Sequence, residues 1–274
     1  MPITAENISF TYNIGLPTEK KVLHNVSFSL ERGEIISLIG HTGSGKSTLC
    51  LLLSGLLAPD CGRITIDGKA TTEGRIARRN IGLVFQYPEY QIFSESVQEE
   101  IAFAPVNWKM TPEETAENVK YAAETVGLPL SLLGASPYSL SGGEKRKIAI
   151  ASAISHRPSY LILDEASAGL DRDSAAQLRK MIHSFAADGK GIMIITHDPE
   201  EALTLSDKIL ILEEGKNIFF GTPCECAEYL CENSVKGIAL PEILEISKRL
   251  KNAGKIKKLA CTPESLMELI RKNA

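Results

Sequence analysis

Residues 34–48 have the sequence EIISLIGHTGSGKST, and this stretch decides the fold. Its first part, Glu34–Gly40, is a short apolar run typical of a buried strand, and Lys46–Leu57 is an apolar segment of helix length. Residues 40–47 match G-x-x-x-x-G-K-[ST], a phosphate-binding motif when a strand precedes it and a helix follows. The stretch therefore predicts a nucleotide-binding loop; a glycine loop that only makes a tight turn is the alternative.

The loop has suitable residues for the phosphates of a nucleotide and for Mg²⁺. Its glycines leave backbone N–H groups free to point at phosphate oxygens, and the helix start adds a positive dipole. Lys46 can reach the β- and γ-phosphates, and the Ser47 hydroxyl can ligate Mg²⁺. We expect nucleotide contacts from the whole loop, namely Gly40, His41, Thr42, Gly43, Ser44, Gly45, Lys46, Ser47 and Thr48.

A second apolar strand sequence, Leu161–Leu163, ends in two adjacent carboxylates, Asp164 and Glu165. Asp164 is placed to hold Mg²⁺ through its water shell, and Glu165 is placed to polarise a water for attack on the γ-phosphate. A strand followed by Asp-Glu is common on its own. Together with the phosphate-binding loop upstream, the pair predicts nucleotide hydrolysis with Glu165 as a catalytic residue.

Strand and helix sequences alternate along the chain. Buried-strand runs occur at Ile81–Phe85, Tyr160–Leu163 and Ile192–Thr196, and helical sequence follows each of them. This alternation predicts an α/β fold with a mostly parallel sheet and helices on its faces. Further strands are expected at Ile8–Tyr12, Val26–Leu30 and Cys61–Gly68, and a closing hairpin at Ile209–Leu212 and Asn217–Phe220.

The segment Leu140–Glu144 (LSGGE) is a second candidate for anion binding. Ser141 stands three residues before Glu144, which predicts a capping box at the start of a helix. The Ser141 hydroxyl and the N–H groups of Gly142 and Gly143 at a helix N-terminus can also hold an anion. A capping box without a ligand is the alternative.

With this segment, the chain resembles the ATP-binding-cassette (ABC) ATPases over residues 3–222, with the motifs in the family's order. The resemblance implies a P-loop NTPase fold of the ABC type, with an antiparallel β subdomain and a helical subdomain at about residues 87–158. It further implies an ATPase domain over residues 1–222 and a short C-terminal helical segment over residues 223–274.

The resemblance also implies roles for single residues, with ATP and Mg²⁺ as cofactors. Ser141–Gly143 would grip the nucleotide bound to the opposite subunit, and Asp171 would lie in the loop that crosses the dimer interface. Tyr12 would stack on adenine, although a half-buried strand tyrosine is the alternative. Gln86 would sense Mg²⁺ and the membrane partner, and His197 would contact the γ-phosphate, although a lone histidine is more often structural.

One departure from the family pattern follows the catalytic glutamate. Ala166 stands where the family usually has proline, and Ser167 stands where threonine is frequent. Neither position contributes a catalytic group. We therefore expect a change in backbone stiffness and little change in chemistry.

Two neighbouring stretches, Phe85–Phe93 (FQYPEYQIF) and Val97–Pro105 (VQEEIAFAP), narrow the family further. They resemble the ATPase subunits of energy-coupling factor transporters, in which FQxPxxQ-[ILV]-F and A-F-x-P recur. The resemblance implies that the chain pairs with a second cassette ATPase. The pair would drive uptake of a vitamin or transition-metal ion through a transmembrane subunit and substrate-binding membrane proteins. The segment after Thr222 would help to hold the two ATPases together.

The same resemblance implies that Gln86–Phe93 borders the groove that receives coupling helices of the transmembrane subunit. Tyr87, Tyr90 and Phe93 would supply apolar contacts there, and an ordinary surface of the helical subdomain is the alternative. Acidic partners for basic residues of that subunit would be Glu89, Glu95, Glu99 and Glu100.

Other functions compete with this interpretation. A conventional importer with a solute-binding protein would use the same catalytic residues. A soluble cassette protein that acts on ribosomes or DNA usually has two cassettes, a long coiled coil or a zinc module, none of which the sequence contains. A GTPase would need an Asn-Lys-x-Asp guanine motif, which is also missing.

Composition is consistent with a globular protein at the cytoplasmic face of the cell membrane. The 274 residues are 43% hydrophobic and 23% charged. No apolar run approaches the roughly 20 residues that cross a bilayer, and we expect no export leader before Glu6. The net charge of −4 argues against nucleic acid as a partner. Together with the resemblance, this predicts a peripheral membrane protein.

Two features of the last part of the chain have no assigned role. Residues 248–258 contain six basic residues and no acidic one, and a solvated helix face is expected; lipid headgroups or a partner are alternatives. Cys224, Cys226 and Cys231 lie close in sequence, but their spacing is not the C-x₂-C of zinc sites. We expect free thiols.

Overall fold

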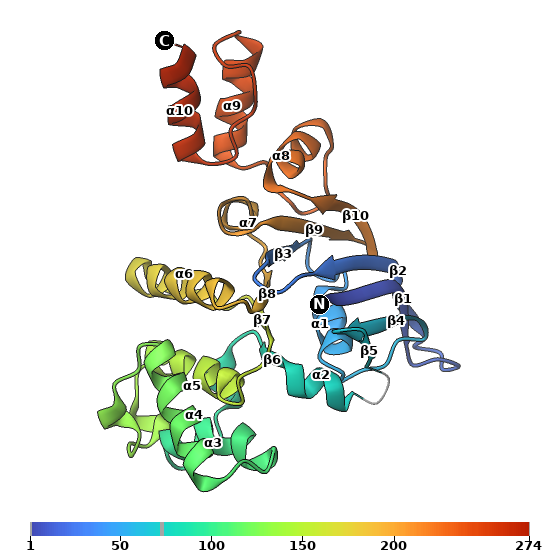
Figure 1. Ribbon diagram of the computed structural model, residues 1–274. Coiled ribbons are helices and arrows are strands. Elements are labelled where there is room, and N and C mark those ends of the chain that lie inside the picture. The colour runs from blue at the N-terminus through green and yellow to red at the C-terminus, as the bar shows by residue number, and fades with distance from the viewer. Residues whose placement is uncertain (1, 72–73, 274) are drawn as a thin grey trace.

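The computed structural model describes residues 2–71 and 74–273. Within these ranges the strands form two sheets, and helices surround both (Figure 1). The larger sheet has the order β10-β9-β3-β8-β7-β6, and the smaller has the order β2-β1-β4-β5. The predicted α/β architecture is confirmed.

The larger sheet is mostly parallel. Its strands β9, β3, β8, β7 and β6 run in the same direction, and β10 pairs antiparallel to β9 as the predicted hairpin. Every residue of β3, β7 and β8 is buried, as expected for strands covered on both faces. The bounds are β3 Ile35–Ile39, β6 Ile81–Val84, β7 Tyr160–Asp164, β8 Gly191–Ile195, β9 Lys208–Glu213 and β10 Lys216–Gly221.

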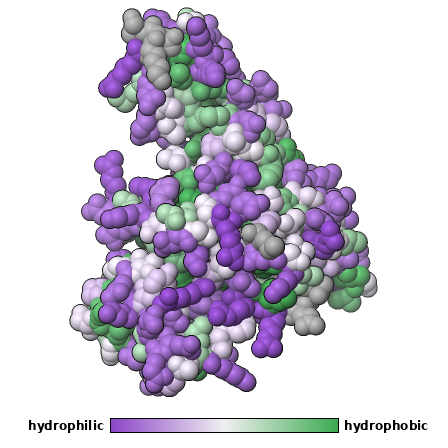
Figure 2. Space-filling view, in the orientation of Figure 1, coloured by the Kyte–Doolittle hydropathy of each residue, from purple (hydrophilic) through white to green (hydrophobic). Residues whose placement is uncertain are grey.

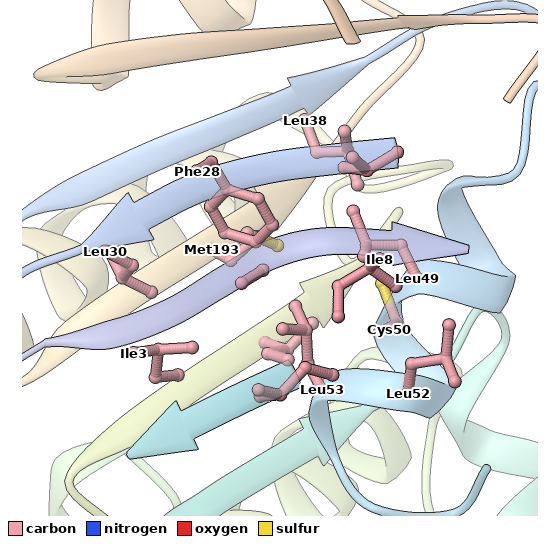
Figure 3. Packing of buried hydrophobic residues seen from close by; sticks show 14 of the residues in the cluster. Ile3, Ile8, Phe28, Leu30, Leu38, Leu49, Cys50, Leu52, Leu53 and Met193 are labelled. Atoms are coloured by element: carbon pink, nitrogen blue, oxygen red, sulfur yellow. The ribbon is translucent and has the colours of Figure 1, made fainter. Parts of the chain in front are cut away.

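The smaller sheet is antiparallel and packs on the first helix, α1 (Lys46–Leu53). Figure 3 shows side chains from β1 and β2 facing those of α1, with Leu38 of β3 and Met193 of β8 in the same core. This core fixes the helix that follows the phosphate-binding motif. The bounds are β1 Ile3–Tyr12, β2 Lys20–Leu30, β4 Cys61–Ile66 and β5 Lys69–Ala70.

Helices α3, α4 and α5 form a separate group at the β6 end of the sheet (Figure 1). Each begins with a complete capping box, at Ser96, Thr111 and Ser141 respectively. Their apolar faces share one core with β7, β8 and α6. The bounds are α2 Arg75–Asn80, α3 Val97–Asn107, α4 Pro112–Thr125, α5 Gly142–Ile154, α6 Arg172–Ala187 and α7 Pro199–Leu205, with 3₁₀ turns at Pro88–Gln91, Leu130–Leu132 and Pro137–Ser139.

The last helices, α8 (Pro223–Glu232), α9 (Glu242–Asn252) and α10 (Pro263–Asn273), extend from the opposite end of the molecule (Figure 1). Their apolar side chains share a core with α7 and β9, and Figure 2 shows hydrophobic side chains gathered around α8 and the adjoining strand β10. In the described parts of the chain, no helix is both long and apolar enough to span a membrane.

Two local predictions were wrong at helix ends. Helix α1 was predicted to reach Leu57 but ends at Leu53, because Gly55 adopts a left-handed φ of +70°. The basic run 248–258 is exposed as predicted, but α9 ends at Asn252, so only its first half is helical. Gly254, with φ of +70°, follows that helix end.

Candidate active site

The phosphate-binding motif forms the turn between β3 and α1, as predicted. Gly45 precedes the helix with a φ of +107°, a conformation that favours glycine. A Cβ at Gly40 would lie 2.2 Å from the carbonyl oxygen of Leu212 in β9. Both glycines are therefore required for the loop to curl tightly between the sheet and the helix.

Lys46 folds back over this loop. Its Nζ donates hydrogen bonds to the carbonyl oxygens of Gly40 (2.7 Å) and His41 (3.0 Å). An ammonium group has three donors, so one is left for a phosphate oxygen. Burial lowers the pKa of Lys46, while the charges of Glu165 and Asp164 oppose that shift.

Ser47 and Asp164 form the oxygen pair expected at a magnesium site. The Ser47 hydroxyl donates to Oδ2 of Asp164 over 3.3 Å. Burial raises the pKa of Asp164, and the neighbouring charge of Glu165 raises it further. Two crowded carboxylates beside a hydroxyl are a donor set that Mg²⁺ prefers, and a cation there would relieve the repulsion. These residues fit the metal.

Glu165 lies between two other predicted catalytic residues. Its carboxylate accepts a hydrogen bond from Nε2 of Gln86 at 2.7 Å, and its Oε1 lies 3.6 Å from Nδ1 of His197. Its backbone has a left-handed φ of +48°, and its N–H donates to the carbonyl oxygen of Ile195 in β8. The backbone thus turns sharply at the end of β7 and directs the carboxylate toward its two neighbours.

Sheet topology explains why these residues meet. Adjacent parallel strands β3, β8, β7 and β6 end at one edge of the sheet, where ligands bind in open α/β folds. A cavity of about 350 Å³ at this edge contains most of the predicted residues. Its lining includes Tyr12, Thr42, Gly43, Gly45, Lys46, Ser47, Thr48, Gln86, Asp164 and Glu165, and also Lys20 and Val22.

Lys20 and Val22 are cavity residues that sequence reasoning missed. Both lie on β2, and Lys20 pairs with Tyr12 across the two strands. The predicted strand Val26–Leu30 started too late to reveal this pairing. Tyr12 lines the cavity, but its ring also packs edge-on against Phe10 and its hydroxyl lies 3.3 Å from that of Thr48.

Four predicted residues near the phosphate-binding loop and Glu165 lie apart from the cavity wall. Gly40 and Ser44 are buried within the loop itself. His41 lines a second cavity, on the side of the β9–β10 turn. His197 lines a third cavity, which it shares with Glu165 between α6 and α7.

Ser141, Gly142, Gly143 and Asp171 do not line the cavity that holds Lys46. Ser141 donates to Glu144 over 2.6 Å and accepts from its N–H over 3.3 Å, which confirms the predicted capping box. The hydroxyl and the backbone N–H of Ser141 both donate to the carboxylate of Glu144, and these two bonds lower its pKa. Asp171 caps α6 by accepting from the N–H of Ser174, which lowers the pKa of Asp171.

Arg146 is a buried residue that sequence reasoning missed. Its guanidinium donates to the carbonyl oxygens of Ala166 (3.2 Å) and Ala168 (2.7 Å), just after Glu165. It also lies 3.7 Å from the carboxylate of Glu89. The sequence feature that could have revealed Arg146 is its position in LSGGEKR, one turn into the helix that Ser141 caps. Arg146 thereby joins α5 to the loop that carries the predicted catalytic glutamate.

The stretch after Gln86 presents aromatic side chains to solvent. Tyr87, Tyr90 and Phe93 are all exposed, and Phe93 packs edge-on against exposed Phe103 of α3. The expectation that Glu100 faces a partner was wrong. Glu100 is only 4% exposed and accepts from the N–H groups of Phe93 and Ser94, because those loop donors need an acceptor.

One other side chain also differs from the sequence interpretation. Glu89, expected to face a partner, instead lies against Arg146 within the chain. The expected free thiols at Cys224, Cys226 and Cys231 are confirmed. Cys224 lies beside Cys261, with 3.3 Å between their sulfur atoms. Among the described residues, no cluster of three or more His, Cys, Asp or Glu could hold a metal ion.

Comparisons with known proteins agree with this geometry. The family model described as "ABC transporter" matches residues 23–168. The energy-coupling factor transporter ATP-binding protein EcfA2 of Caldanaerobacter subterraneus subsp. tengcongensis is 41% identical over 93% of this chain and 91% of its own length. The EcfA2 protein of Clostridium perfringens is 36% identical over the full length of both chains.

Solved structures show the same likeness. CbiO1 from Clostridium perfringens, described as part of the ABC transporter complex cbiONQ, aligns with a TM-score of 0.75 and 30% identity over 91% of this chain and 94% of its own. The ATP-binding cassette MJ0796, a dimer bound to ADP and Pi, aligns with a TM-score of 0.71 and 27% identity over 81% of this chain and 98% of its own. The chain therefore belongs to the ABC transporter ATPases, in the family of energy-coupling factor transporter ATP-binding proteins.

Proposed function

We propose that this chain binds and hydrolyses ATP as a subunit of an energy-coupling factor transporter, driving uptake of a vitamin or transition-metal ion. The observation that carries the proposal is the position of Glu165. Its carboxylate lies between Gln86 and His197 and beside the cavity of the phosphate-binding loop. A carboxylate so placed can orient and polarise a water in line with the γ-phosphate.

Residues of this chain divide the work at the nucleotide. Lys46 binds the β- and γ-phosphates with its remaining N–H, and backbone amides of the loop hold the other phosphate oxygens. Ser47 and Asp164 hold Mg²⁺, which when bound supplies charge neutralisation at the phosphates. His197, beside Glu165 in the neighbouring cavity, would reach the γ-phosphate from that side. Gln86 keeps Glu165 in position, and Tyr12 stacks on the adenine.

A second cassette ATPase completes each site. In this proposal Ser141–Gly143 bind the γ-phosphate of the nucleotide in the other subunit, and Asp171 lies at the interface between the two. Support comes from their location outside the chain's own nucleotide cavity and from their exposed position at the start of α5 and of α6. ATP closes the pair because it bridges both surfaces, and hydrolysis removes that bridge.

The membrane partner docks on the aromatic stretch that follows Gln86. Three exposed aromatic side chains, Tyr87, Tyr90 and Phe93, supply apolar contact for its coupling helices. A transmembrane subunit bound there holds the chain at the cytoplasmic face of the membrane, and the substrate-binding subunit is reached through it. The ATPase domain covers residues 1–222, and residues 223–274 form a C-terminal helical segment.

Replacement of the catalytic glutamate tests the hydrolytic role. In the purified transporter complex, Glu165→Gln should bind ATP normally, hydrolyse it about 10³-fold more slowly and accumulate as a closed dimer. Glu117→Gln, an exposed glutamate on α4, is the matched control and should keep full turnover. Normal turnover in Glu165→Gln would remove that residue from catalysis.

Affinity purification of the tagged chain from solubilised native membranes tests the assembly. A second cassette ATPase, a shared transmembrane subunit and small substrate-binding membrane proteins should copurify. Recovery of a permease pair with a separate solute-binding protein would contradict the energy-coupling assignment. Recovery of ribosomes or DNA without membrane proteins would contradict a role in transport.

A further inference from the structure

The loop between α8 and α9, residues 233–241, lies directly against the phosphate-binding loop. Gly237 in this loop has a left-handed φ of +70°. A Cβ at Gly237 would lie 2.6 Å from the Cβ of His41 and 3.4 Å from its Cα. Real Cβ atoms do not approach so closely, so no other residue type fits at position 237 unless one of the two loops moves.

The 233–241 loop is held firmly on its other side. The backbone N–H of Lys236 donates to Glu213 over 2.8 Å, and its ammonium lies 3.1 Å from the carboxylate of Glu214. The neighbouring residue Val235 is buried in the same apolar cluster as Ile39, the last residue of β3. These contacts fix the backbone of the loop next to Gly237.

The turn between β9 and β10, which contains Glu214, also contacts the phosphate-binding loop. Gly215, which follows Glu214, donates its N–H to the carbonyl oxygen of Ser44 over 3.0 Å. The ring of His41 bonds only to its neighbour Thr42, and its Nε2 is buried without a partner among the described residues. Among the described residues no hydrogen bond joins the His41 ring to the 233–241 loop, so close packing against Gly237 is the contact on this side.

We propose that the 233–241 loop is a buttress that holds the phosphate-binding loop in its nucleotide-binding conformation through the contact of Gly237 with His41. The C-terminal helices thereby set the ATP affinity of the chain's own site. By linkage, ATP binding stabilises the position of the buttress to the same extent. The proposal rests on the proposed nucleotide site at residues 40–47.

Alanine at position 237 tests the contact. Gly237→Ala should weaken ATP binding about tenfold, a typical size for coupling between two sites, because the new Cβ displaces His41. Gly254→Ala is a closely matched control. Gly254 lies in the same C-terminal segment with the same φ of +70°, but a Cβ there has no atom within 4 Å. Its ATP affinity should change by less than about twofold.

Changes at His41 identify the colliding atom. In a His41→Gly background the nearest atom to a new Cβ at position 237 is the Cα at 3.4 Å, an ordinary contact. There Gly237→Ala should add less than about a twofold loss of affinity. In a His41→Ala background the Cβ remains, so the roughly tenfold loss should persist. Each effect is measured against its own single-variant background.

The outcomes separate this proposal from the proposed function. Equal ATP affinities of Gly237→Ala and Gly254→Ala, or a tenfold effect that persists with His41→Gly, would overturn the buttress. Thermal unfolding of both glycine variants checks that each one folds. If Gly237→Ala does not fold, amide hydrogen exchange of the unaltered chain provides the test. ATP should slow exchange at residues 235–239 more than at residues 253–256. An equal change in the two segments would overturn the proposal. ATP binding unaffected by Lys46→Ala would instead refute the nucleotide site.

Discussion

The starts of helices α1 and α5 are the two proposed anion-binding sites of the chain, and they differ in what surrounds them. At α1, Ser44 and Lys46 are buried, no side chain caps the helix, and the lysine folds over the loop. At α5, Ser141–Gly143 are exposed and the helix already has a complete capping box. The first start is thus enclosed by its own chain, whereas the second is exposed to solvent.

The two helix starts also differ in the charged side chains beside them. The α1 site brings Lys46 together with two carboxylates that can hold a metal, so it has the groups needed for binding and for chemistry. The α5 start has an anionic neighbour, Glu144, which accepts from the hydroxyl of Ser141. Ser141 must turn from Glu144 toward a phosphate to bind it. In the proposed function, such a start contributes only when another subunit delivers the nucleotide.

The largest expected effect on ATP hydrolysis comes from a bulky side chain at Ser141, which precedes α5. Ser141→Arg should leave ATP binding at the chain's own Lys46 site intact and lower hydrolysis at the partner subunit's site about 10³-fold, because it blocks donors aimed at that γ-phosphate. A photoreactive ATP analogue, followed by separation of the subunits, reports each site. Lys46→Ala should give the opposite result, with loss of labelling in this chain. Loss of this chain's own labelling in Ser141→Arg would contradict the division of roles.

Arg146 connects the two regions within one chain. Arg146→Met should lower the free energy of unfolding by about 3 kcal/mol. The buried carbonyl oxygen of Ala166 and the half-buried one of Ala168 would lose their donor, and Glu89 would lose its counter-charge. Because the loop after Glu165 loses its support, turnover should also fall while ATP affinity stays within about twofold.

Denaturant unfolding and steady-state ATPase measurements check both parts of this prediction. Arg249→Met, at an exposed position on α9, is the matched control and should change the stability by less than about 0.5 kcal/mol. If Arg146→Met were as stable and as active as the unaltered chain, the two regions would not be connected through this residue.

Sequence alone predicted the α1 region well because its chemistry is written in consecutive residues. The strand, the glycine loop and Lys46 follow one another directly, so one local motif predicts the position of all three. Asp164 and Glu165 could be predicted equally well, because they stand at the end of an apolar run that reads as a buried strand. Parallel pairing then brings these strand ends together without further information.

What sequence missed depends on contacts between distant segments. Arg146 meets the carbonyl oxygens of Ala166 and Ala168 only because α5 packs at the β6 edge of the sheet, next to β7, and no local pattern encodes that. Glu100 looked like an exposed helix glutamate, yet the preceding loop needed its carboxylate as an acceptor. The closeness of Gly237 to His41 likewise spans almost 200 positions. Such contacts follow from tertiary packing, which periodicity does not reveal.

The smallest expected effect concerns the far end of α5, where His156 is buried. Neither ring nitrogen has a hydrogen-bond partner among the described residues. Burial, with a smaller contribution from the charge of Arg79, lowers the pKa of His156 from 6.5 to about 4. The unfolded chain therefore binds a proton between these pH values and the folded chain does not, so stability falls as the pH drops from about 6.5 toward 4.

From these two pKa values, His156 should lower the free energy of unfolding by about 2 kcal/mol between pH 7 and pH 5. His156→Leu should remove that part of the pH dependence, whereas His183→Leu, on the exposed face of α6, should retain it. Urea unfolding at both pH values measures the difference. Since His156 follows the helix that Ser141 begins, acid should loosen the α5 region before the α1 region. Equal amide exchange of α1 and α5 at pH 5 would mean that acid does not distinguish the two helix starts.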